Sequence, residues 1–119
     1  MKNIELAKLL YEMKPGDPPS LHKGENWYTM WNSNTVEEAW EEAEKTGLIP
    51  DWEHDWIALK ELLLVVIKNF DPYMLVSLYP EDKEKIYEVN FTKDSDVVAC
   101  GYGFTLEQTI VNAIINSLP

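Results

Sequence analysis

The stretch GYGFTLEQTIVNAIINSL, residues 101–118, decides the fold at the C-terminal end of the chain. Its first three residues alternate glycine with tyrosine, which is typical of a strand whose backbone another element approaches closely. Thr105 and Gln108 have the spacing of a capping box, in which two side chains satisfy the free N–H groups of a helix start. The apolar residues that follow lie at helical spacing: Leu106, Ile110, Ala113, Ile114 and Leu118. The stretch therefore predicts a strand that leads directly into an amphipathic helix.

Strand-like segments rich in apolar and aromatic residues precede this helix, with short turn-rich segments between them. They are Tyr73 to Tyr79, Lys85 to Thr92 and Val97 to Phe104. Connections this short imply antiparallel neighbours. In the middle segment Tyr87, Val89 and Phe91 alternate with Glu88, Asn90 and Thr92. Because successive side chains of a strand point to opposite faces, one face of the sheet is expected to be partly polar.

The N-terminal half predicts helices and one further strand. A broad apolar face indicates a helix from Asn3 to Met13, and the proline and glycine content of Pro15 to Gly24 indicates a loop. The segment Glu25 to Asn32 reads as a short aromatic strand. A second helix starts after the capping pair Thr35 and Glu38 and ends at Gly47 and Leu48 in a Schellman motif.

A third helix is expected from Asp55 to Phe70. The residues at helical intervals on its apolar stripe are Trp56, Leu59, Leu62, Leu63, Val66, Ile67 and Phe70. The predicted order is α-β-α-α-β-β-β-α. This order indicates an α+β fold in which helices pack on an antiparallel sheet of three or four strands. At 119 residues the chain has the length of one domain, so we expect a single domain over 1–119.

The charge of the chain excludes several classes of partner. The formal net charge is −11, and the ten basic residues are all lysine. A negative field repels nucleic acid and anionic membranes, so we expect neither as a direct partner. The longest strongly apolar run, Leu62 to Ile67, is far shorter than a membrane span, and the start of the chain lacks an apolar signal core. The lone Cys100 fits a reducing compartment, which indicates the cytosol of the host cell.

Two stretches resemble parts of a known family. They are SNTVEEAWEEAEK, residues 33–45, and ACGYGFTLEQTIVNAIINSL, residues 99–118. The first is similar to the signature helix of the phage ABA sandwich domain proteins, and the second is similar to the closing strand and helix of that family. The first helix and the placement of Trp27 and Trp31 are also similar. The resemblance implies a phage-encoded accessory protein without known catalysis. Anti-Thoeris proteins, which look related in organisation, bind a nucleotide-derived alarm signal and hide it from host defence.

The chain departs from this family at two places. Asn112 stands where the family's last helix commonly offers an arginine, so a phosphate contact from that side chain is not implied. The helical segment Asp51 to Phe70 is an insertion.

Other candidate sites have plainer structural explanations. Gly101 and Gly103 precede a helix start, which suggests phosphate binding by the helix amides. However, Thr105 is expected to occupy those amides. A ring such as that of Trp40 or Trp56 is expected to pack on the bare backbone of the glycines. Acidic residues surround His54, yet their spacing matches no metalloprotease motif, and we predict no metal and no cofactor. No nucleophile and base can be paired from their spacing, so no catalytic residue is expected and an enzyme is the least favoured class.

Aromatic and amide side chains remain as the candidate ligand site. Stacking on rings and hydrogen bonds from the polar face of the sheet would suit a nucleotide base. The candidate residues are Trp27, Trp31, Tyr87, Asn90, Thr92, Tyr102, Phe104 and Asn112, with Lys85 and Lys93 as the nearest cations along the chain.

The resemblance and this candidate site together predict a non-enzymatic phage accessory protein that sequesters a small nucleotide-derived host signal. The alternative is an acidic inhibitor of a basic host protein, in which the carboxylates from Glu37 to Glu44 mimic a nucleic-acid backbone. A simpler explanation for these carboxylates is the solvated side of a helix. A homo-oligomer is possible, because a small domain with many aromatic residues can bury some of them between subunits.

Overall fold

The structure is a computed structural model that describes residues 2–10, 20–23, 26–29 and 36–118. Its contacts group the chain into two compact units, Met1–Pro50 and Asp51–Pro119. The single domain expected over 1–119 stays a prediction.

The first unit holds two helices and a β-hairpin. Helix α1 is Lys2–Leu10, strands β1 and β2 are Ser20–Lys23 and Asn26–Thr29, and helix α2 is Val36–Lys45. The loop predicted for residues 15–24 is wrong at residues 20–23, where β1 pairs antiparallel with β2. The four residues SLHK contain one apolar residue, Leu21, and are too few to predict a strand by alternation, so the strand is recognised from its pairing with β2.

Helix α2 ends as predicted. The N–H of Leu48 donates to the carbonyl of Ala43 at 3.0 Å, and the N–H of Gly47 donates to that of Glu44 at 3.2 Å. Gly47 has a φ of 73°, the left-handed conformation that a Schellman motif requires. Trp40 and Ala43 on this helix are buried. The predicted cap, Thr35, lies outside the described residues.

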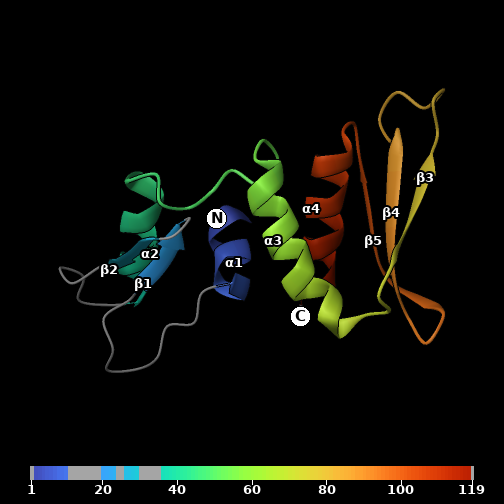
Figure 1. The fold of residues 1–119 in the computed structure, drawn as a ribbon. Helices are drawn as coiled ribbons and strands as arrows, with labels where there is room; N and C mark the ends of the chain where they lie inside the picture. Colours follow the sequence, from blue (N-terminus) through green and yellow to red (C-terminus); the bar gives the residue numbers. More distant parts are fainter. Residues whose placement is uncertain (1, 11–19, 24–25, 30–35, 119) are drawn as a thin grey trace. The chain divides into compact units, whose positions relative to one another are not determined.

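The second unit confirms the predicted α+β class with an antiparallel sheet of three strands. Its elements are helix α3 (Trp56–Val66), the short 3-10 helix η1 (Ile67–Asn69), strands β3 (Met74–Leu78), β4 (Tyr87–Lys93) and β5 (Asp96–Gly103), and helix α4 (Leu106–Ser117). The strands lie in the order β3-β4-β5. Figure 1 shows α4 between α3 and the sheet, with β5 nearest to α4 and β3 farthest from it.

Helix α3 begins at the side chain of Asp55, which accepts a hydrogen bond from the N–H of Ala58 at 3.1 Å. Leu59, Leu62 and Val66 are buried, as their spacing predicts. Trp56 was expected on the same stripe, but 47% of its surface is exposed, so that expectation is wrong. The preceding Trp52 is fully buried instead. It lies in a non-helical turn, where helical spacing has no predictive value.

Helix α4 packs directly on the backbone of β5. A Cβ atom added to Gly101 would lie 2.3 Å from the backbone nitrogen of Ala113, and one added to Gly103 would lie 2.7 Å from Oγ1 of Thr109. The glycines therefore accommodate α4 itself, and not the ring of Trp40 or Trp56 that the sequence suggested. Because α4 follows β5 after a two-residue connection, the strand and its covering helix form one local unit.

Asp71 fixes the hairpin that joins β4 to β5. The two turn residues, Asp94 and Ser95, have positive φ values of 53° and 71°, as in a type I′ turn. Both donate their backbone N–H groups to the carboxylate of Asp71 at 3.2 Å, and the hydroxyl of Thr92 donates to it at 2.8 Å. These hydrogen bonds, from Thr92 first, lower the pKa of Asp71 below its usual value.

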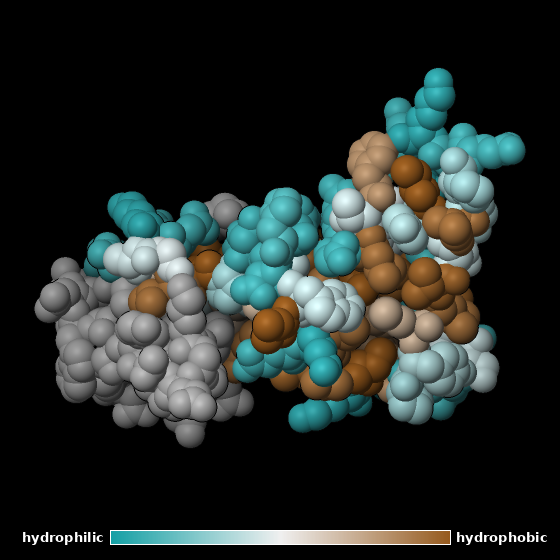
Figure 2. Space-filling view, turned by 45° about the horizontal axis from the view of Figure 1, so that its top comes forward, coloured by the Kyte–Doolittle hydropathy of each residue, from teal (hydrophilic) through white to brown (hydrophobic). Residues whose placement is uncertain are grey.

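Apolar side chains reach the surface of this unit at several places. Figure 2 shows hydrophobic surface on the side of the molecule that carries the three strands. Exposed apolar residues of the sheet include Leu75, Val76, Leu78, Val97 and Val98. Among the described residues, no helix is both long enough and apolar enough to span a bilayer.

Candidate functional site

The sheet has one face turned toward α4 and one turned away from it, which we name the open face. Val89 and Phe91 of β4, together with Ala99 and Gly101 of β5, are buried on the side of α4. Residues directly opposite each other in a ladder share a face. On the open face, Glu88 of β4 lies opposite Ser77 of β3 and Tyr102 of β5. Asn90 of β4 lies opposite Leu75 of β3 and Cys100 of β5.

Glu88 is the centre of a polar cluster on the open face. Its Oε2 atom accepts a hydrogen bond from the hydroxyl of Tyr79 at 3.0 Å, and its Oε1 atom accepts one from Nδ2 of Asn90 at 2.9 Å. The sulfur of Cys100 lies 3.9 Å from Oε1. The hydrogen bond to Glu88, followed by the negative charge of Glu88, raises the pKa of Tyr79 above its usual value. The carboxylate is thus held in place and has acceptor capacity left, since its two oxygens offer about four lone-pair sites.

Tyr102 and Lys85 form the second part of the cluster. Nζ of Lys85 lies 4.7 Å from the centre of the Tyr102 ring, which is a cation–π contact. A hydrogen bond with the side chain of Cys100 is the largest cause that raises the pKa of Tyr102, and the negative charge of Glu88 raises it further. Lys85 is positioned by Asp82, whose Oδ1 atom accepts the backbone N–H of Lys85 at 2.9 Å. The open face therefore brings together a fixed carboxylate, an aromatic ring and one cation.

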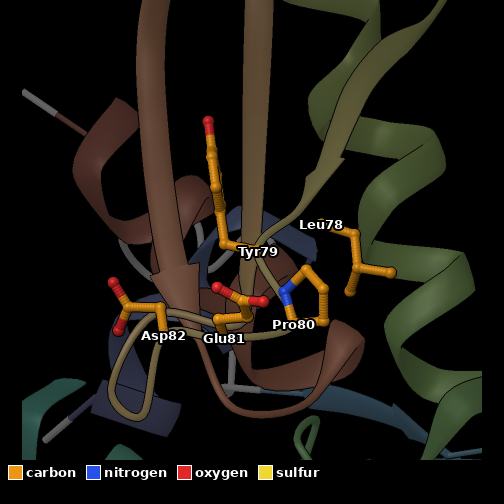
Figure 3. Close-up of a pocket in the computed structure, with 5 residues that line it drawn as sticks. All are labelled: Leu78, Tyr79, Pro80, Glu81 and Asp82. Atoms are coloured by element: carbon orange, nitrogen blue, oxygen red, sulfur yellow. The ribbon is translucent and has the colours of Figure 1, made fainter.

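A hollow lies at the end of the sheet beside this cluster. It has a volume of about 480 Å³, opens widely to solvent, and is lined by the five residues from Leu78 to Asp82. Figure 3 shows Tyr79 extending over the strands while Leu78 points away from it. Tyr79 thus belongs both to the hollow and, through Glu88, to the polar cluster.

The structure brings together only some of the predicted site residues. Asn90 and Tyr102 both contact the Glu88 cluster on the open face. Tyr87 lies on the opposite face, paired with Gly103, because side chains alternate along β4. Thr92 is buried and donates to Asp71, since the register shifts between Phe91 and Thr92. Tyr87 and Thr92 are therefore not part of the cluster.

The remaining predicted residues lie elsewhere. Phe104 is exposed at the junction of β5 and α4, and its N–H donates to Oε1 of Gln108 at 3.0 Å. Nδ2 of Asn112 donates to the carbonyl of Tyr102 at 2.7 Å, so this side chain ties α4 to β5. The backbone of Trp27 belongs to β2, opposite His22, while its side chain and all of Trp31 lie outside the described part.

The glycine junction and the acidic segment offer no ligand geometry of their own. Oγ1 of Thr105 accepts the N–H of Gln108 at 3.1 Å, so the helix start is capped as the sequence predicts. Nδ1 of His54 lies 2.7 Å from Oδ2 of Asp51. Within the described ranges, no three His, Cys, Asp or Glu side chains are grouped so that they could hold a metal ion.

Alternation along β4 predicts Glu88 on the polar face, but the predicted site residues include neither Glu88 nor Tyr79 nor Cys100. The available signal was the spacing Glu88-x-Asn90 on the central strand, which puts a carboxylate and an amide on one face. A comparison of the chain with protein-family models, curated proteins and solved structures finds no match. The fold and site therefore define the class of the protein on their own: an α+β protein with a polar cluster on the face of its sheet that is turned away from α4.

Proposed function

We propose that the open face around Glu88 binds a small nucleotide-type ligand and that the protein acts by sequestering this ligand without converting it. The observation that carries the proposal is the fixed carboxylate of Glu88, which two neighbours hold in place beside an exposed tyrosine ring. The resemblance to phage accessory proteins supports the same role, in which a phage protein removes a host defence signal in the host cytosol.

Each part of a nucleotide has a chemical counterpart in the cluster. The free lone pairs of Glu88 suit the hydroxyl groups of a ribose or the N–H groups of a base. The rings of Tyr79 and Tyr102 are both exposed and offer apolar surface for a base. The ammonium group of Lys85 suits a phosphate, and its flexible stem lets it leave the Tyr102 ring when a phosphate is bound.

The strongly negative chain favours ligands with few phosphates. A net charge of −11 repels anions at long range, and within the described residues the cation in contact with the cluster is Lys85. We therefore expect cyclic dinucleotides and ADP-ribose-type molecules to bind better than nucleoside triphosphates. The carboxylate of Glu88 is half-buried and negatively charged. Each further phosphate next to it should therefore weaken binding.

A thermal-shift screen against cyclic dinucleotides and ADP-ribose tests this proposal. A ligand at 100 times its Kd adds about 2.7 kcal/mol of stability, which gives a clear rise in Tm. The variant Glu88→Gln should abolish this rise, whereas Glu61→Gln, which makes the same charge change at an exposed position of α3, should keep it. No shift with either class of ligand, or an equal shift in Glu88→Gln, would refute the proposal.

The acidic-mimic alternative rests on one observation in the first unit. Helix α2 exposes a row of carboxylates while Trp40 and Ala43 are buried; the exposed acids are Glu37, Glu38, Glu41, Glu42 and Glu44. A basic host protein captured through them should be released steeply as salt rises. Salt-independent capture would exclude this function.

A further inference from the structure

Strand β3 leaves its outer backbone groups available for another strand. The N–H of Tyr79 donates to the carbonyl of Ile86, so this residue directs its backbone groups toward β4. Because the direction alternates along an antiparallel strand, Leu75 and Ser77 also bond to β4. Met74, Val76 and Leu78 consequently direct their N–H and C=O groups out of the sheet, where the described part of the chain places no further strand.

The other edge of the sheet differs. The carbonyls of Cys100 and Tyr102 on β5 accept hydrogen bonds from Nδ2 of Asn116 at 2.8 Å and Nδ2 of Asn112 at 2.7 Å. These two side chains, one turn apart on α4, occupy the carbonyls that a further strand would need. The β3 edge is therefore the one at which the sheet can be extended.

The sequence around β3 is close to a palindrome. Residues 72–80 read PYMLVSLYP, with Val76 at the centre. If two copies of the strand pair antiparallel about Val76, Tyr73 lies opposite Tyr79, Met74 opposite Leu78, and the prolines lie opposite each other at both ends. This register aligns the outward N–H and C=O groups of residues 74, 76 and 78, and about six main-chain hydrogen bonds form.

The exposure and charge of the strand agree with this pairing. Val76 is 48% exposed and Leu78 is 58% exposed, although both are apolar. The segment from Tyr73 to Tyr79 carries no charge in a chain of net charge −11, so two copies can meet there without opposing carboxylates. Edge pairing buries part of the exposed apolar surface of these seven residues, so the interface is smaller than a standard one, to which each partner contributes about 800 Å².

We propose that the protein forms a two-fold symmetric dimer through antiparallel pairing of β3 with β3 of a second copy. The dimer joins the two three-stranded sheets into one continuous sheet and places both Glu88 clusters on the same face. Its outer edges are then two β5 strands, whose carbonyls are occupied by Asn112 and Asn116, so assembly stops at the dimer. The small interface predicts a dimer whose population rises with protein concentration.

Sedimentation velocity over a range of protein concentrations tests the dimer. The wild type should shift from monomer to dimer with rising concentration. Val76→Lys places two like charges at the centre of the pairing and should give a monomer at every concentration. The control Val98→Lys makes the same change at a position that is 51% exposed on β5, and should dimerise like the wild type. A wild type that stays monomeric into the millimolar range, or a Val76→Lys variant that dimerises normally, would overturn the proposal.

A second test uses a disulfide between two copies of β3. It does not require the strand to tolerate a lysine at position 76. In the proposed register, Val76 faces its own copy as a hydrogen-bonded pair with a Cα–Cα distance of about 5.5 Å, which a disulfide can bridge. In a Cys100→Ser background, Val76→Cys should form a covalent dimer under mild oxidation far faster than Val98→Cys. Equal rates of crosslinking in the two variants would contradict pairing through β3.

Discussion

Replacement of Gly101 by alanine should destabilise the second unit because α4 lies directly on the backbone of β5. The added Cβ atom would lie 2.3 Å from the nitrogen of Ala113, 2.6 Å from the carbonyl oxygen of Thr109 and 2.8 Å from the Cα atom of Ala113. All three atoms belong to the backbone of α4, so no side-chain rotation relieves the contact. To reach ordinary contact at 3.4 Å, the helix has to retreat by about 1 Å.

That retreat loosens the fully buried side chains Ile110 and Ile114. Inserting a methyl group into a packed interior costs about 1–3 kcal/mol, and we expect a value near the upper end for Gly101→Ala. Urea-induced unfolding, followed by far-UV circular dichroism, measures this loss. A change in the free energy of unfolding below about 0.5 kcal/mol would show that α4 does not pack on β5 as described.

Gly103 provides a matched comparison. The nearest atom to its added Cβ is the side-chain Oγ1 of Thr109, at 2.7 Å. Thr109→Ala removes this atom, so it should partly rescue Gly103→Ala but should not rescue Gly101→Ala. The expected coupling energy is about 1 kcal/mol for the first pair and near zero for the second. Equal coupling in the two pairs would contradict the packing described here.

Two further predictions concern the core and the hairpin. Leu59→Ala on α3 should lower the free energy of unfolding in urea by about 2–5 kcal/mol because Leu59 is fully buried. Leu64→Ala on the same helix should lower it far less, since Leu64 is 56% exposed. Equal losses in the two variants would contradict the assignment of the buried face. The lowered pKa of Asp71 means that its carboxylate stabilises the fold above the unfolded-state pKa of about 4, and that this contribution is lost as the pH falls through the folded-state pKa. The difference in urea midpoint between the wild type and Asp71→Asn should therefore be largest at neutral pH and vanish in acid; a difference that is constant with pH would contradict the role of the carboxylate.

Local signals in the sequence predict the helices and strands of the second unit well. The cap of α4 at Thr105 is encoded within four residues, and the alternation along β4 separates Val89 and Phe91 from Glu88 and Asn90. Such features depend on neighbours along the chain, so they can be inferred without the tertiary structure. The Schellman end of α2 at Gly47 belongs to the same class.

The site depends on register, which the sequence does not reveal. Glu88 meets Tyr102 only because the β4–β5 hairpin closes through Asp94 and Ser95, two residues in a conformation usually taken by glycine or asparagine. Asp71, more than twenty residues earlier in the chain, holds this turn through its carboxylate. Residue type alone groups Tyr87 with Asn90 as site candidates, whereas alternation along β4 puts their side chains on opposite faces.

We propose that the open face around Glu88 is a ligand surface. Backbone amide chemical shifts, recorded while ADP-ribose or a cyclic dinucleotide is titrated into the protein, test it most directly. We expect concentration-dependent changes at Glu88, Asn90, Cys100 and Tyr102, and none at buried positions of α3 such as Leu62. A spectrum that does not change with either ligand, or changes confined to residues away from the open face, would contradict the account.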